Sequence, residues 1–496
     1  MIDTIICIGN GQEQASHQGR KIALKNKIPW MGVLDFTTEV DKGCYHTSIY
    51  DIKAPSLLDK ITNKNVKIIV LDQDQSYYTD ELEFYKTLDL AQSIVNTADV
   101  EFLNKDFDNP IKQILKNNKS FCIMPFISIF SQEGNILSCC HMNHMKPITT
   151  IKELTNFNTD DKIQNVRQQM MRGELVRDKC SHCYDKENLG MISHRTMYTI
   201  DWAYRENFKS LDEIANNIGL KNYELSVGNK CNAMCRICSS KYSNLINQEY
   251  IKIGLAKEVE VKIFKGDFDV VNIAEAKKVY LNGGEPTISK DFILFLQRCI
   301  ALNRTDLEIV VNTNGFKLTD TLMELVQQFP NFKFEISIDG YKDLQTYIRW
   351  PIPWDTFVGN VTKMYDITNK KISFNTVVSI YNIANLYEIF SFLESNYPGV
   401  ESHLNNLTNW SHLVYTNFPD KQLALNNLEK IKSLKFYKEN DTFRSRIDSI
   451  IYNLQHTKID IDVLKKFFEF NDLLDKSRNV RLKDYVPNLD RGRNII

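Results

Sequence analysis

Hydrophobic and polar residues follow a regular pattern between residues 223 and 408. Short runs of β-branched and aromatic residues alternate with longer amphipathic stretches, which is typical of parallel strands with helices outside the sheet. The helices that this pattern predicts include residues 290–302, 320–328 and 354–367. Six strands are predicted, at residues 223–227, 278–282, 307–312, 333–338, 372–378 and 401–407. The segment is therefore expected to belong to the α/β class.

The first 110 residues show a comparable alternation on a smaller scale. The turn Gly9-Asn10-Gly11 favours a tight strand-to-helix connection over a dinucleotide-binding loop, because position 14 is Gln14 and the third glycine of GxGxxG is absent. The pattern predicts a small α/β domain over residues 1–110, with strands at 4–8, 30–36, 45–51 and 66–71 and a helix at 79–97. Residues 417–496, at the other end, are charged and helical in pattern.

Length and charge narrow the class of protein. A chain of 496 residues is too long for one ordinary core and predicts roughly two to four domains. Its 61 basic and 62 acidic side chains nearly cancel, so no net field steers it to nucleic acid or to anionic lipid. The first residues contain an early acid and only a short apolar run, which fits neither a secretory signal nor a membrane anchor. We expect a cytoplasmic protein with no membrane partner and no nucleic-acid partner.

The 11 cysteines gather mainly in clusters, a distribution typical of metal ligation in a reducing compartment rather than of disulfides. Cys231, Cys235 and Cys238 have CxxxCxxC spacing and directly follow the strand predicted at 223–227. Three thiolates on one short loop can hold three corners of an iron-sulfur cubane and leave the fourth iron for a non-protein ligand. A structural zinc site is the alternative, but residues 239–241 supply no fourth Cys or His.

The cysteine loop resembles the signature of the radical S-adenosylmethionine (SAM) superfamily, and later segments match that family's partial (β/α)6 barrel in order. The resemblance implies a 4Fe-4S cluster on the three cysteines, with the amino and carboxylate groups of SAM on the free iron. It also implies that one electron from the cluster cleaves SAM to a 5′-deoxyadenosyl radical, which removes a hydrogen atom from substrate. The barrel is expected over residues 215–410.

Polar motifs follow the later strands of this predicted barrel, at the ends where the loops converge. In the GGEP motif, two glycines expose backbone and the Glu285 carboxylate can accept hydrogen bonds from the SAM ammonium group. Asp339 can contact SAM or can simply belong to an Asp-Gly turn. Arg349 can pair with the SAM carboxylate or can form an ordinary ion pair at the surface. The resemblance thus assigns SAM contacts to Gly283, Gly284, Glu285, Ser337, Asp339 and Arg349.

A second cysteine-rich segment, residues 119–202, resembles a twitch or SPASM auxiliary-cluster unit, although in that family the unit usually follows the barrel. The resemblance favours Cys139 over Cys140, because the ligand stands five residues after the hairpin glycine, here Gly134. A zinc ribbon with cysteine pairs from two hairpins is the alternative. The expected ligands of the auxiliary 4Fe-4S cluster are Cys122, Cys139, Cys180 and Cys183. Four nearby histidines are interpreted mostly as surface residues that such a cluster does not need: His141, His144, His182 and His194.

These features predict a radical SAM enzyme that acts oxidatively on a peptide or small-metabolite substrate. Its auxiliary cluster would relay electrons, and a flavodoxin or ferredoxin would be a suitable electron donor. Two alternatives remain: an enzyme that modifies nucleotides or sugars, and a non-catalytic iron-sulfur or zinc scaffold. The GGEP glutamate and an open iron corner distinguish the enzymes from the scaffold, which needs neither.

Overall fold

A computed structural model describes strands 4–8, 30–35, 43–45, 66–70 and 99–102, and residues 110–143, 146–154, 156–188, 193–256, 266–407 and 410–496. The chain divides into two compact units. Unit 1 comprises Met1–Asn118 and Ala203–Glu213, and unit 2 comprises Lys119–Trp202 and Ile214–Ile496. Each unit is an α/β structure in its own right.

Unit 1 contains a five-stranded sheet in the order β3-β2-β1-β4-β5. Its pairs are parallel except for β2 and β3, which run antiparallel. The strands predicted at 4–8, 30–36 and 66–71 are confirmed within a residue, and β5 was not predicted. Of the strand predicted at 45–51, only Tyr45 lies among the described residues, where it ends β3. The predicted helix at 79–97 and the glycine turn at 9–11 lie outside the described residues. The elements are β1 (Thr4–Ile8), β2 (Trp30–Asp35), β3 (Gly43–Tyr45), β4 (Val66–Val70), β5 (Asp99–Phe102) and α4 (Pro110–Asn117).

Unit 2 is built on one nine-stranded sheet in the order β14-β13-β12-β11-β10-β9-β6-β7-β8. The six predicted strands correspond to β9–β14, and every adjacent pair among them is parallel. The cysteine-rich segment extends the same sheet, because β6 pairs in parallel with β9 and continues into the antiparallel strands β7 and β8. The bounds are β6 (Ser128–Gln132), β7 (Asn135–Leu137), β8 (Thr149–Thr150), β9 (Asn222–Ser226), β10 (Lys278–Asn282), β11 (Glu308–Thr313), β12 (Phe332–Ser337), β13 (Ile372–Val378) and β14 (Glu401–Asn406).

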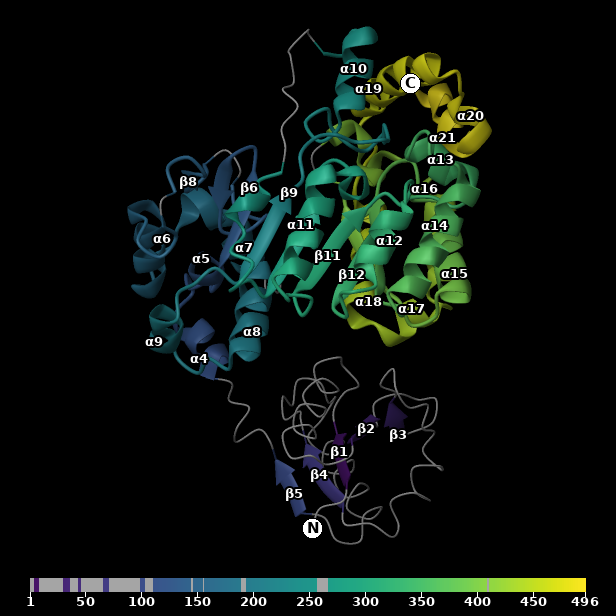
Figure 1. The fold of residues 1–496 in the computed structure, drawn as a ribbon. Coiled ribbons are helices and arrows are strands. Elements are labelled where there is room, and N and C mark those ends of the chain that lie inside the picture. The colour runs from purple at the N-terminus through teal and green to yellow at the C-terminus, as the bar shows by residue number, and fades with distance from the viewer. Residues whose placement is uncertain are drawn as a thin grey trace. The chain divides into compact units, whose positions relative to one another are not determined.

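One face of this sheet is apolar and carries the core. Residues such as Leu281, Val311 and Phe334 are fully buried, and each such side chain stabilises the fold by about 1.5–3 kcal/mol. Figure 1 shows helices lying side by side across this sheet, and the contacts of α11 with α12 and of α12 with α14 agree. The three predicted helices are confirmed within a residue or two at their ends: α11 (Lys290–Ala301), α12 (Asp320–Val326) and α14 (Trp354–Ile367). A further helix, α15 (Leu386–Asn396), follows β13.

The opposite face of the sheet is polar, because alternate residues of the strands point away from the helices. Lys278 of β10 forms an ion pair with Glu308 of β11 at 2.9 Å. Lys333 of β12 forms another with Glu401 of β14 at 2.6 Å. Parallel sheets are usually apolar on both faces. The polar inner face of this sheet departs from that rule.

Helices surround the remaining parts of unit 2. In the cysteine-rich segment they are α5 (Met124–Ile127), α6 (Asp161–Met171), α7 (Arg177–Asn188) and the start of α8 (His194–Glu206), and α9 (Leu211–Asn216) follows the segment. Parts of α8 and α9 fall within Ala203–Glu213 of unit 1. Short helices also follow β9 and β12, namely α10 (Asn244–Lys252) and α13 (Asp343–Ile348). The carboxyl-terminal residues are helical as predicted: α16 (Lys421–Ile431), α17 (Lys435–Glu439), α18 (Asp441–His456), α19 (Ile461–Arg478), α20 (Leu482–Tyr485) and α21 (Pro487–Asp490). Among the helices described, not one has the length and apolar character needed to cross a membrane.

Candidate metal centres and cofactor site

The CxxxCxxC cysteines lie on the loop between β9 and α10, at the carboxyl end of the first strand of the parallel series. Cys235 is buried, and Cys231 and Cys238 are partly exposed. Two backbone hydrogen bonds fix the middle of the loop: the Met234 N–H donates to the Trp350 carbonyl at 2.6 Å, and the Arg236 N–H donates to the Ile348 carbonyl at 2.7 Å. The loop is thus held against the segment that follows β12.

The Gly283-Gly284 pair packs against the start of this loop. Gly283 has a φ of 111°, a conformation that side chains disfavour. The Gly284 N–H donates to the Gly228 carbonyl at 2.7 Å. A Cβ atom added at Gly284 would lie 2.2 Å from the Lys230 carbonyl oxygen, so only glycine fits. The glycines therefore allow the turn after β10 to approach the cysteine loop at backbone contact distance.

Glu285 is almost fully buried, and its carboxylate accepts four hydrogen bonds. One oxygen accepts from the Thr287 N–H at 3.1 Å, the Thr287 hydroxyl at 2.8 Å and the Thr313 hydroxyl at 2.7 Å. The other accepts from the Asn314 N–H at 2.8 Å. Burial raises the pKa of Glu285, and these donors oppose the rise. The carboxylate thus ties the GGEP turn to the end of β11.

Asp339 and Arg349 form a buried ion pair beside the cysteine loop. Arg349 Nε lies 2.6 Å from one oxygen of Asp339, and the other oxygen accepts from the Val377 N–H at 2.7 Å. Arg349 also places a guanidinium nitrogen 3.8 Å from the sulfur of Cys235. Burial lowers the pKa of Arg349, but Asp339 and Cys235 outweigh that effect and the pKa rises. A permanent positive charge therefore stands next to one of the three thiols.

Burial disfavours the thiolate form of all three cysteines. Burial is the main cause that raises the pKa of Cys231 and Cys235, and it raises that of Cys238 to about 12. Neighbouring thiols also raise the pKa of Cys231 and Cys238, because thiolates at this spacing repel one another. A bound cation reverses this balance and deprotonates coordinating thiols outright. The chemistry of the loop fits a metal centre.

Ser337 lies at the end of β12 on the polar inner face. Its hydroxyl lies 3.4 Å from the Asn312 side-chain oxygen, and the Asn312 amide donates to Glu335 at 3.0 Å. The Tyr280 hydroxyl donates to the same carboxylate of Glu335. A connected polar network thus crosses β10, β11 and β12. Ser337 belongs to this network, whereas Asp339, two residues later, faces Arg349.

The four predicted auxiliary ligands, although distant in sequence, line one pocket. Cys122 precedes α5, Cys139 follows β7, and Cys180 and Cys183 lie one turn apart on α7. A zinc ribbon would carry the latter pair on a hairpin, so that alternative does not match the observed local structure. Burial raises the pKa of Cys122 to about 12 and also raises those of Cys139 and Cys180. The pocket fits a metal that would deprotonate these thiols.

Cys140 does not line this pocket. Its N–H donates to a carboxylate oxygen of Glu224, on β9, at 3.2 Å. Burial raises the pKa of both Glu224 and Cys140, and the Glu224 charge raises that of Cys140 further. Glu224 pairs in register with Tyr280 of β10, so it belongs to the polar inner face. This contact joins the auxiliary pocket to the inner face across β9.

Several site residues were not predicted from the sequence. Arg236, between Cys235 and Cys238, donates to Asp475 of α19 at 2.7 Å. Asn314 lies with its amide nitrogen 3.9 Å from the Cys231 sulfur. The charge of Arg236 inside the CxxxCxxC motif was a signal in the sequence, but its partner Asp475 lies 239 positions away. Asn314 belongs to the turn after β11, where the strand-end rule already placed polar ligands.

Comparison with known proteins defines the class of the central segment. Residues 225–393 match the family model described as the Radical SAM superfamily. The match begins within β9 and includes the cysteine loop, the GGEP turn and the Asp339–Arg349 pair.

One curated relative is a GTP 3',8-cyclase from Mannheimia succiniciproducens, 26% identical over 157 residues, which are 31% of this chain and 44% of that protein. The chain thus matches less than half of the relative's length. Among solved structures, native anSMEcpe with bound AdoMet has a TM-score of 0.33 at 16% identity, covering 45% of this chain and 63% of that one. Streptococcus suis SuiB bound to S-adenosylmethionine has a TM-score of 0.29 at 13% identity, covering 70% and 60%. The family match and the curated relative support an enzyme whose reaction is unspecified.

Proposed function

We propose that the chain is a radical SAM enzyme in which Cys231, Cys235 and Cys238 hold a 4Fe-4S cluster. The observation that carries the proposal is the placement of these thiols on one loop at the carboxyl end of β9, inside the matched domain. When bound, the cluster and SAM would supply a 5′-deoxyadenosyl radical. β9–β14 would form a partial (β/α)6 barrel around the site.

The chain's own residues would bind and orient SAM rather than react. Gly283 and Gly284 bring peptide groups to the cysteine loop, and Arg349 offers a charge beside Cys235. Ser337 lies on the inner face, where a sugar hydroxyl can hydrogen-bond. The Glu285 and Asp339 carboxylates are already engaged by donors of the chain. Their proposed part in SAM binding is therefore to fix the turns around it, in addition to any direct contact.

The polar inner face supports a hydrophilic substrate. The Tyr280–Glu335–Asn312 network on this face suits a hydrophilic peptide or small metabolite, which would lose a hydrogen atom to the 5′-deoxyadenosyl radical. Cys122, Cys139, Cys180 and Cys183 would hold an auxiliary 4Fe-4S cluster that relays electrons, as a fully ligated cluster leaves no iron for substrate. A flavodoxin or ferredoxin in the cytoplasm would supply the reducing electron.

A nucleotide-modifying or sugar-modifying enzyme is the second candidate. The observation that favours it is the GTP 3',8-cyclase relative, whose similarity covers 31% of this chain. Peptide and nucleotide substrates are distinguished by which one increases 5′-deoxyadenosine formation when it is added to the reconstituted enzyme.

The proposal is tested by anaerobic reconstitution with iron and sulfide, reduction, and measurement of 5′-deoxyadenosine formed from SAM. The wild-type chain should form it, and Cys235→Ala should not. Cys299→Ala is the matched control, because Cys299 is a buried cysteine on α11 outside both thiol groups and should leave cleavage unchanged. Cleavage by Cys235→Ala at the wild-type rate would refute the assignment.

A further inference from the structure

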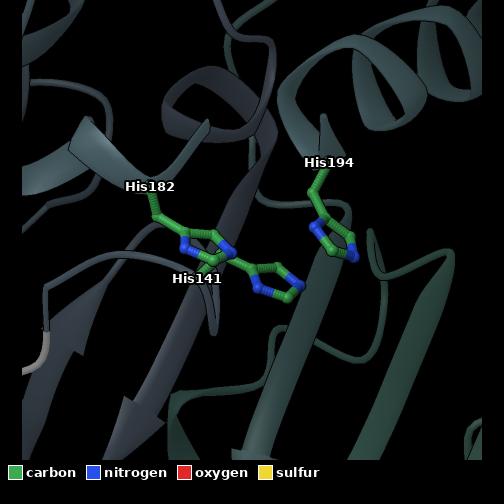
Figure 2. Close-up of side chains that lie close together, drawn as sticks. All are labelled: His141, His182 and His194. Carbon is green, nitrogen blue, oxygen red and sulfur yellow. The ribbon is translucent and has the colours of Figure 1, made fainter. Parts of the chain in front are cut away.

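Three histidines converge at the auxiliary cysteine pocket, and two of them, His141 and His194, line it together with the cysteines. His141 follows the cysteine pair after β7, His182 lies on α7 and His194 begins α8. One ring nitrogen from each can be chosen so that all three lie within 4.8 Å of one another. Figure 2 shows the three rings approaching one another from these separate segments.

The segments that carry the histidines are fastened to one another. The Asn143 N–H donates to the Lys179 carbonyl at 2.9 Å, which fixes the turn of His141 to the start of α7. Arg195 donates to Glu187 at 2.9 Å, which fixes the start of α8 to the end of α7. The close approach of the rings therefore follows from the backbone arrangement. The Arg195 charge, which would repel a cation, is balanced by Glu187.

We propose that His141, His182 and His194 form a binding site for one divalent transition metal ion of the Zn²⁺ type, separate from the proposed iron-sulfur ligands. Zn²⁺ binds imidazole nitrogen at about 2.0–2.1 Å, so tetrahedral ligands stand roughly 3.3 Å apart. The chosen nitrogens lie within 4.8 Å of one another, so the rings must turn to bring them to that spacing.

The geometry also defines what such a site can do. The rings of His141 and His194 stack with centroids 3.5 Å apart and an interplanar angle of 19°. To bind the same metal ion the two rings must tilt apart, because a ring nitrogen directs its lone pair within the ring plane. His182 is exposed, which gives the ion a path from solvent. Three protein ligands leave a fourth position for water or a small anion, as in catalytic rather than structural zinc sites.

The test uses the full chain with its thiol sites first loaded with iron and sulfide under anaerobic conditions, so that the cysteines are occupied. Zn²⁺ is then titrated against a competing chelator, and the bound metal is examined by X-ray absorption. We expect one Zn²⁺ per chain, with nitrogen or oxygen neighbours at about 2.0–2.1 Å and no sulfur at about 2.3 Å. A sulfur shell, or no binding at all, would overturn the proposal.

His182→Ala is the decisive variant, because its exposed position makes misfolding a minor concern. Outer-shell substitutions already lower metal affinity roughly 10- to 100-fold, so loss of a ligand should lower the Zn²⁺ affinity by at least that factor. His456→Ala, an exposed histidine of α18, is the control and should bind as the wild type does. Equal affinity in wild type and His182→Ala would count against the site even if Zn²⁺ binds. Because Zn²⁺ binding is read directly, the outcome does not depend on SAM cleavage.

Discussion

Replacing Asp475 by Asn tests how the carboxyl-terminal helices hold the cysteine loop, which carries Cys231, Cys235 and Cys238. Asp475 lies on α19 and is 8% exposed. One of its oxygens accepts from Arg236 at 2.7 Å and from the Tyr347 hydroxyl at 2.8 Å. The other accepts from the Leu482 N–H at 2.7 Å and the Asn471 amide at 3.1 Å. A single carboxylate therefore satisfies four buried donors, one of which carries a full charge.

The expected cost follows from this count. An Asn side chain has one acceptor oxygen, and its NH2 group can only donate. Whichever way the Asn side chain is turned, two of the four donors therefore lose their acceptor. The Arg236 charge, whose side chain is fully buried, also loses its counter-ion. Breaking a buried pair in this way costs roughly 3–5 kcal/mol. We expect the urea unfolding free energy of the metal-free chain to fall by about that amount at an unchanged slope with urea.

Asp484→Asn provides the comparison on the neighbouring helix α20. The Arg481–Asp484 pair has a similar distance of 2.9 Å, but its side chains are 68% and 45% exposed. Exposed pairs contribute about 0–1 kcal/mol, so this variant should hardly change the unfolding curve. Iron retention should separate the two as well, because only Asp475 supports the loop between Cys235 and Cys238. Equal and small effects on stability would refute the idea that Asp475 clamps the cluster loop.

Three further predictions concern the thiol sites and the loop packing. Gly284→Ala should abolish SAM cleavage, because the added Cβ would lie 2.2 Å from the Lys230 carbonyl oxygen. Gly359→Ala should keep activity and stabilise α14 by up to about 1 kcal/mol, because a Cβ there has nothing within 4 Å. Activity assays and melting curves compare the two variants. Cys180→Ala should lower iron from roughly eight to four per chain, retain abortive SAM cleavage and stop productive turnover, as iron and 5′-deoxyadenosine analyses would show. Burial raises the pKa of Cys122 from 9.0 to about 12, so its neutral form stabilises the metal-free fold fully below pH 9 and this contribution is lost as pH rises toward 12. The urea midpoint should accordingly fall more steeply over that range in wild type than in Cys122→Ala, and parallel curves would contradict this.

Much of the fold was predictable because the parallel strands are buried on one face and regular in spacing. The strands expected at 278–282 and 372–378 have those bounds in the structure, and the helix expected at 354–367 does too. Local pattern is sufficient there, since each strand is followed by a helix that covers it. The cysteine spacing likewise identified the loop that follows β9.

Long-range pairing was not accessible in the same way. The pairing of β6 with β9 places the cysteine-rich segment on the edge of the sheet, although the segment precedes that sheet in sequence. The ties of Arg236 to Asp475 and of Cys140 to Glu224 join residues far apart in sequence. Hydrophobic periodicity carries no information on such contacts. The histidines beside the auxiliary cysteines had one usable signal, because two of them stand within two residues of an expected ligand: His141 after Cys139, and His182 between Cys180 and Cys183.

The central claim is that the loop from Cys231 to Cys238 holds a cluster with one iron open to SAM. Electron paramagnetic resonance of the reduced, reconstituted chain tests it most directly, in a Cys180→Ala background that isolates this cluster. SAM carrying ¹⁵N in its amino group should change the cluster signal and show a nitrogen coupling to it. A signal that SAM leaves unchanged, or a loop that holds zinc instead of iron, would contradict the account.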